Sequence, residues 1–143
     1  MNYTKTTQIN APVEQVFIFC ASSDGFEKHF PHPIKWIDTE KNWKLGSLIE
    51  FKFRFLSMWL YWKAEITEYQ QNKLFTDVSR SDFPYKYFAH SHLFESQGEK
   101  TIYTDKIEFS FGLGNLIDKV VDIPLLESTF SQRHIRMKHV FNC

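Results

Sequence analysis

A two-residue alternation of apolar and polar positions dominates the chain between residues 34 and 111, as is typical of β-strands buried on one face. In the clearest strand, four apolar residues alternate with three charged ones: Ile49, Phe51, Phe53, Phe55 against Glu50, Lys52, Arg54. Similar patterns predict the remaining strands over 2–9, 34–36, 59–69, 73–80, 83–94 and 101–111. Because short turns join most of them, consecutive strands are expected to pair as an antiparallel meander.

Two short helices are expected after the first strand. Pro12 suits the first turn of a helix that runs to residue 20. Ser23 and Asp24 can cap a second helix over 23–30, which two prolines then stop.

The end of the chain changes to three- and four-residue spacing, which predicts a long amphipathic helix capped at Asn115 and bent at Pro124. Its apolar stripe is Leu116, Val120, Ile123, Phe130, Met137 and Phe141. One sheet and one helix with apolar faces bury them against each other. We therefore predict an α+β fold, in which a curved antiparallel sheet of about seven strands wraps the long helix, in a single domain over 1–143.

Composition narrows the classes of function. The 17 basic and 17 acidic residues balance, and no segment is strongly basic, which argues against a nucleic-acid partner. The polar start of the chain predicts no signal peptide, and no apolar run is long enough to span a membrane. We therefore expect a cytoplasmic location and no membrane insertion. Cys20 lies in an apolar run and is expected to be a reduced core residue.

The most informative stretch places two imidazoles on one aromatic strand face, where Phe88, His90, His92 and Phe94 recur at period two. A turn at 97–100 brings the next strand back beside this one. If the turn is tight, His92 faces Asp105 and His90 faces Ile107.

These polar residues admit several interpretations. A buried Asp105 carboxylate requires a partner, and His92 or a water would serve. The pair could be structural, or Asp105 could orient His92 as a general acid and base. A metal site would use His90, His92 and Asp105 with His134 as a distant fourth ligand. Because no clear fourth ligand is present, we predict no metal and no cofactor.

Several segments resemble the START-like superfamily, also called SRPBCC, which includes polyketide cyclase/dehydrase-like proteins. Ile9 to Phe17 is similar to its opening I-x-A-P-x-x-x-V-F, and Trp62 to Ile66 with Phe75-Thr-Asp77 resembles its central strands. Pro84 to Phe94 is similar to the H-x-H-x-F stretch of a ligand-binding branch. Asp105, Phe109, Phe130 and Arg133 complete that pattern, whereas Phe88 stands where the branch usually has Trp.

The resemblance implies the helix-grip fold, with a cavity between sheet and long helix that holds an apolar small molecule of lipid, sterol or polyketide type. Ten residues are the candidate ligand contacts: His90, His92, Asp105, Phe53, Phe55, Trp62, Phe75, Phe88, Phe109 and Phe130. Arg133 and the segment from His29 to His32 are expected at the surface.

Three functions remain open: a carrier or sensor of an apolar molecule, a cyclase or dehydratase using His92 and Asp105, and a protein-interaction module with a solid interior. The apolar hairpin tip at 55–60 is either a lid or an interface, so a homodimer is possible. The sequence does not identify the ligand.

Overall fold

The computed structural model describes residues 1–81, 85–112 and 115–141, of which 115–122 are described by their backbone alone. These residues form, in order, β1 (Asn2–Ile9), α1 (Val13–Cys20), α2 (Ser23–His29), β2 (Ile34–Asp38), β3 (Leu48–Phe55), β4 (Met58–Gln70), β5 (Leu74–Ser79), β6 (Tyr87–Gln97), β7 (Lys100–Ser110) and α3 (Asn115–Val140).

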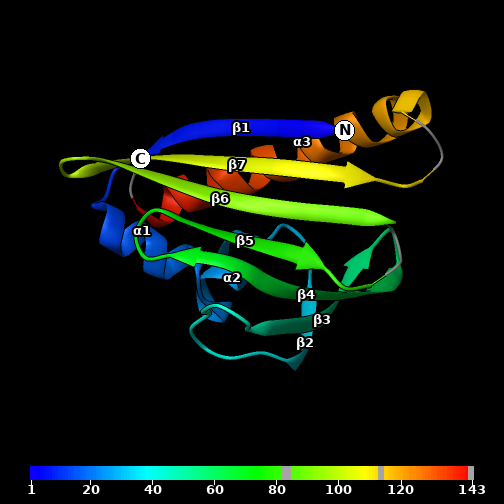
Figure 1. The fold of residues 1–143 in the computed structure, drawn as a ribbon, viewed down its shortest axis with the longest axis horizontal. Coiled ribbons are helices and arrows are strands. Elements are labelled where there is room, and N and C mark those ends of the chain that lie inside the picture. The colour runs from blue at the N-terminus through cyan, green and yellow to red at the C-terminus, as the bar shows by residue number, and fades with distance from the viewer. Residues whose placement is uncertain (82–84, 113–114, 142–143) are drawn as a thin grey trace.

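The strands form one seven-stranded antiparallel sheet in the order β1-β7-β6-β5-β4-β3-β2. The meander from β2 to β7 is as predicted, and β1 closes the far edge beside β7. The sheet is curved, and α3 runs along its inner face behind β1, β7 and β6, while α1 and α2 lie next to one end (Figure 1). The predicted α+β helix-grip architecture is confirmed.

Local chemistry explains the helix boundaries, with one correction. The second short helix is capped by Ser22, whose hydroxyl accepts a hydrogen bond from the Gly25 N–H, and not by Ser23 or Asp24. The helix α3 continues through Pro124. The predicted cap at Asn115 and the stripe residues Leu116 and Val120 lie outside the described side chains, as do Phe83, Pro84 and Cys143.

The buried apolar side chains form two clusters. One surrounds α1 and includes Phe17, Phe75 and Phe94, and the other lies against α3 and includes Phe88 and Phe130. Along β6 the two clusters are separated by the two histidines between Phe88 and Phe94. The core is therefore interrupted by polar groups where the sheet faces α3. No helix among the described residues is long and apolar enough to cross a membrane.

Candidate functional site: a cavity with a buried polar cluster

The register of three neighbouring strands places the polar residues. On β6 and β7, His92 lies opposite Asp105 and His90 lies opposite Ile107, as predicted. On the other side of β6, Asp77 of β5 lies opposite His90. Because alternate residues share a face, these side chains all point to the inner face of the sheet.

Asp105 is the centre of the buried cluster. Its Oδ1 accepts hydrogen bonds from the Tyr103 hydroxyl at 2.5 Å and from Nε2 of His90 at 2.6 Å, and its Oδ2 lies 2.6 Å from Nε2 of His134. The carboxylate is 1 % exposed, so these contacts replace its water. The predicted hydrogen bond between His92 and Asp105 is wrong, because Nδ1 of His92 lies 3.6 Å from Oδ1 of Asp105.

The ring of His92 bridges Asp77 and Tyr103 instead. Its Nε2 lies 2.9 Å from Oδ2 of Asp77 and its Nδ1 lies 2.8 Å from the Tyr103 hydroxyl. The ring is stacked between Phe75 and His90, at centroid distances of 4.0 and 3.8 Å. Packing on both faces therefore fixes the orientation of this imidazole.

Burial and charge shift several pKa values in this cluster. Burial, then the neighbouring His90, lowers the pKa of His92 to about 4. Burial acts to raise the pKa of Asp105, but the charge of His90 and the hydrogen bonds from His134 and His90 outweigh it and hold the pKa well below its usual range. Burial, together with the nearby Asp105 charge, raises the pKa of Tyr103 well above its usual value. Near neutral pH we therefore take Asp105 as a carboxylate and Tyr103 as a phenol.

Arg133 of α3 is buried, so its expected position at the surface is wrong. Its side chain is only 6 % exposed, its Nε donates to Nδ1 of His29 at 3.1 Å, and its guanidinium lies over the Phe130 ring at 4.8 Å. Among the residues that the structure describes, no carboxylate lies within ion-pair distance of it. His29 is also buried, and burial followed by the Arg133 charge lowers its pKa well below the usual value.

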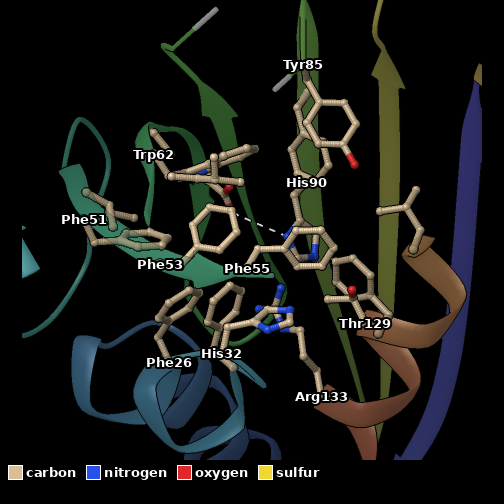
Figure 2. A pocket seen from close by; sticks show the side chains of 18 of the residues that line it. Phe26, His32, Phe51, Phe53, Phe55, Trp62, Tyr85, His90, Thr129 and Arg133 are labelled. Carbon is tan, nitrogen blue, oxygen red and sulfur yellow. Dashed lines mark ion pairs between the residues drawn. The ribbon is translucent and has the colours of Figure 1, made fainter. Parts of the chain in front are cut away.

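A cavity of about 200 Å³ lies between the sheet and α3, next to this cluster. Figure 2 shows Phe51, Phe53 and Trp62 on its sheet side and Thr129 and Arg133 of α3 across from them. His90, His92 and Arg133 are buried polar residues on its wall, and Asp77, whose side chain is 15 % exposed, also lines it. The cavity wall is therefore mostly apolar, and its charged and polar groups are those of Asp77, His90, His92 and Arg133.

The predicted ligand contacts divide into two groups. Seven of the ten line the cavity: His90, His92, Phe53, Phe55, Trp62, Phe88 and Phe130. The other three, Asp105, Phe75 and Phe109, are buried without forming part of its wall. Asp105 lies behind His90 and acts on the cavity only through its hydrogen bonds.

Sequence reasoning did not place Asp77 or Tyr103 among the site residues, and it expected Arg133 at the surface. Two signals were present for Tyr103 and Asp77. Tyr103 precedes Asp105 by two residues and shares its strand face, and Asp77 shares the face of Phe75. His134 was considered only as a distant ligand, yet it bonds Asp105 directly.

The hairpin tip between β3 and β4 is exposed. Leu56 is 82 % exposed and Met58 60 %, while the Trp59 ring carries Lys35 Nζ over it at 4.3 Å. Leu56 and Ser57 both have positive φ, at 51° and 73°, in a two-residue turn. Phe55, at the base of the tip, lines the cavity.

Comparison with solved structures supports the same architecture. A protein from Chromobacterium violaceum matches with a TM-score of 0.82 and 10 % identity over 99 % of this chain and 97 % of that one. Major latex-like protein 151 from ginseng, Panax ginseng, matches with a TM-score of 0.74 and 13 % identity over 99 % and 97 %. The fold is the helix-grip fold. The Aha1 dimer from Colwellia psychrerythraea also shares it, with a TM-score of 0.71 and 16 % identity over 99 % and 96 %.

No protein-family model and no curated protein sequence matches the chain. At these low identities the structural likeness extends to the fold and no further. The function must therefore be argued from the cavity and its side chains.

Proposed function

We propose that this protein binds a small apolar molecule in the cavity between the sheet and α3. The observation that carries the proposal is a hollow of about 200 Å³ whose wall combines aromatic rings with a few buried polar groups. Ligand pockets typically have this composition, in which apolar walls contribute affinity and polar groups fix orientation.

The volume favours a compact ligand. A cavity of about 150 Å³ lined by apolar side chains holds benzene. A hollow of about 200 Å³ therefore suits a molecule of one or two rings, whereas a sterol would require the walls to move apart. Phe53, Phe55 and Leu60 line the cavity and are only half-buried, so we expect such a molecule to enter beside them.

The charged end favours a ligand with an acidic group. The guanidinium of Arg133 reaches the cavity wall and has no carboxylate within ion-pair distance among the described residues. A buried cation is stabilised when an anion pairs with it, and arginine binds carboxylates in a bidentate geometry. The preferred ligand is therefore an aromatic acid.

Two probes of matched shape test this function: 2-naphthoate and the uncharged 2-methylnaphthalene. Both are expected to raise the thermal unfolding midpoint of the chelator-treated protein, naphthoate more strongly. Arg133→Gln is expected to remove the difference between them. An unchanged midpoint with both probes would contradict the proposal.

A plug variant locates the binding. Ala64 is 2 % exposed and lines the cavity, so Ala64→Leu adds volume inside it. Ala89 alternates with the inward residues of β6 and points to the other face, so Ala89→Leu is the matched control. Binding is expected to weaken in the first variant and persist in the second. Equal binding by both variants would place the probe elsewhere.

No specific observation favours the other two functions, a cyclase or dehydratase and a protein-interaction module with a solid interior. The acid–base pair of His92 and Asp105 lacks a direct hydrogen bond, and a solid interior does not agree with the cavity.

A further inference from the structure

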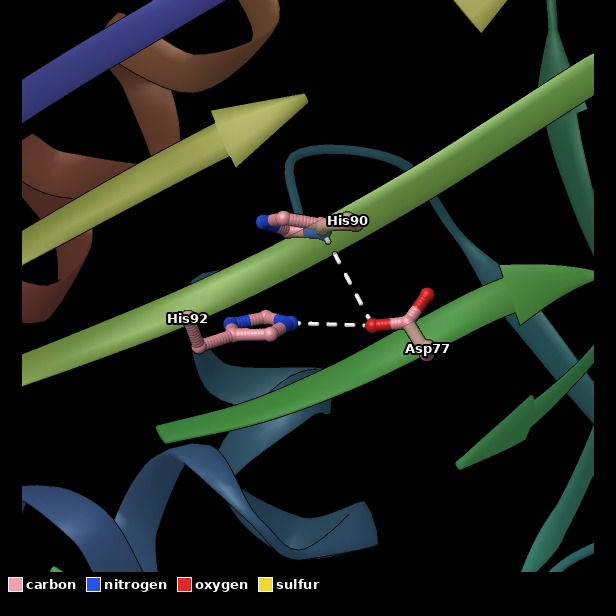
Figure 3. Close-up of side chains that lie close together, drawn as sticks. All are labelled: Asp77, His90 and His92. Carbon is pink, nitrogen blue, oxygen red and sulfur yellow. Dashed lines mark hydrogen bonds and ion pairs between the residues drawn. The ribbon is translucent and has the colours of Figure 1, made fainter. Parts of the chain in front are cut away.

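Three side chains at the inner end of the cavity direct their acceptor atoms at one point. His90, His92 and Asp77 each offer one ligand atom, a ring nitrogen or a carboxylate oxygen, and the three atoms lie within 4.8 Å of one another. Figure 3 shows both imidazoles turned toward the Asp77 carboxylate, with Oδ2 at 2.9 Å from His92 and 3.9 Å from His90. All three residues line the cavity.

The hydrogen bonds behind this point decide which ring nitrogens carry protons. Nε2 of His90 contacts the Asp105 carboxylate, which can only accept, so this nitrogen donates and Nδ1 is the ring nitrogen that could bind a metal. The Tyr103 hydroxyl donates its single proton to Asp105, so its oxygen accepts from Nδ1 of His92. Nε2 of His92 is then the ring nitrogen that faces Asp77, at 2.9 Å, and the one that could bind a metal. These tautomers follow from the hydrogen-bond partners.

We propose that Asp77, His90 and His92 bind a divalent first-row transition metal ion, such as zinc or ferrous iron, with an open coordination position facing the cavity. Two imidazoles and one carboxylate are a usual ligand set for such ions when a site also admits water or a small molecule. Ligands at about 2.1 Å around a tetrahedral ion lie about 3.4 Å apart, between the 2.9 and 3.9 Å found here.

The partners behind the two histidines support the same assignment. Metal-bound histidines almost always donate their other N–H to a carboxylate, a carbonyl or another acceptor, which orients the ring. Here His90 donates to Asp105 and His92 to Tyr103. The expectation of no metal depended on the lack of a further ligand, and it did not consider Asp77, which comes from the neighbouring strand β5. The ionised Asp77 and Asp105 together offset the charge of a divalent ion.

Zinc titration of the chelator-treated full chain, produced without a histidine tag, tests the proposal by calorimetry. Cobalt absorption reports the ligand set. We expect one ion per chain. Asp77→Asn is expected to weaken binding by more than about 100-fold, since even outer-shell changes cost about 10–100-fold. His139→Asn replaces an exposed histidine on α3 and should bind as the wild type does.

Two results would overturn the site: no stoichiometric binding by the wild-type chain, or equal affinity in Asp77→Asn and the wild type. A thermal unfolding curve of Asp77→Asn shows whether it is folded, and His90→Ala is the second variant if it is not. The measurement uses metal ions alone, whereas the naphthalene probes are tested on metal-free protein. Failure of one proposal is therefore distinguishable from failure of the other.

Discussion

Replacement of Asp105 is expected to have two very different outcomes, depending on the side chain introduced. In Asp105→Ala the donors of Tyr103, His90 and His134 all lose their acceptor in a buried place. Each buried donor without a partner costs about 1–3 kcal/mol, so the total is about 3–9 kcal/mol. Because a domain of this kind is stable by only about 5–15 kcal/mol, this variant should be largely unfolded or strongly destabilised.

Asp105→Asn is expected to cost only about 2–3 kcal/mol. The amide oxygen can still accept from Tyr103 and His90, with the loss of about 1 kcal/mol of charge assistance from each bond. The amide N–H₂ then faces Nε2 of His134, which can accept if its proton moves to Nδ1. That atom is the one buried side-chain nitrogen or oxygen without a partner among the described residues, so its new N–H is an unsatisfied donor. Relief of the buried charge offsets part of these costs.

Urea denaturation followed by circular dichroism measures both variants against the wild type. Asp38→Asn is the matched control, because Asp38 is exposed on β2, and it should change the free energy of unfolding by less than about 0.5 kcal/mol. If Asp105→Ala were as stable as Asp105→Asn, the three donors would not converge on this carboxylate, and the cluster described above would be incorrect.

Three further predictions concern the rest of the chain. Burial and the Arg133 charge keep His29 neutral in the folded protein, whereas the unfolded chain takes up a proton near pH 6.5. The free energy of unfolding should therefore fall by up to about 1.4 kcal/mol per pH unit below that pH. Acid denaturation curves of His29→Gln should lose this contribution, and an unchanged slope would contradict the assignment. Met137 is 1 % exposed, so Met137→Ala should lower the free energy of unfolding by about 2–5 kcal/mol in urea titrations. Ile135→Ala, at a 57 % exposed position of the same helix, should lower it by less than about 0.5 kcal/mol, and similar losses in both variants would mean that α3 is rotated. Leu56 has a left-handed backbone conformation that asparagine tolerates better than leucine, so Leu56→Asn should raise the free energy of unfolding by about 0.5–1 kcal/mol in calorimetry. A decrease would argue against this turn.

The sheet could be predicted from the sequence because alternation and short turns determine it locally. The tight turn after Gln97 fixes the pairing of β6 with β7, so the positions of His92 and Asp105 were correct. Which side chains touch was not determined by this register. The His92 ring leans toward β5 and bonds Asp77, while Asp105 is reached by the diagonal neighbour His90.

The cluster members from outside this hairpin depend on long-range geometry. Asp77 meets His90 only because β5 pairs with β6 in one register, and a longer connection joins these two strands. The contacts of Arg133 and His134 depend on how α3 is rotated against the sheet, and the three- and four-residue spacing of its apolar positions leaves that rotation open. A buried arginine also contradicts the usual preference of this residue for the surface.

The volume between sheet and helix likewise follows from side-chain packing and not from the pattern. Alternation gave the inward direction of Phe53, Phe75 and Phe109, yet Phe53 lines the hollow while the other two are buried in the core. The sequence can thus indicate an aromatic interior, but coordinates are needed to distinguish the rings that line the cavity from those packed in the core.

A crystal structure of the chain soaked with 2-naphthoate tests the central claim most directly. The account predicts electron density for one molecule between the sheet and α3, with its rings against Phe53 and Trp62 and its carboxylate at Arg133. An interior closed by repacked side chains, with the probe found only on the outer surface, would contradict it.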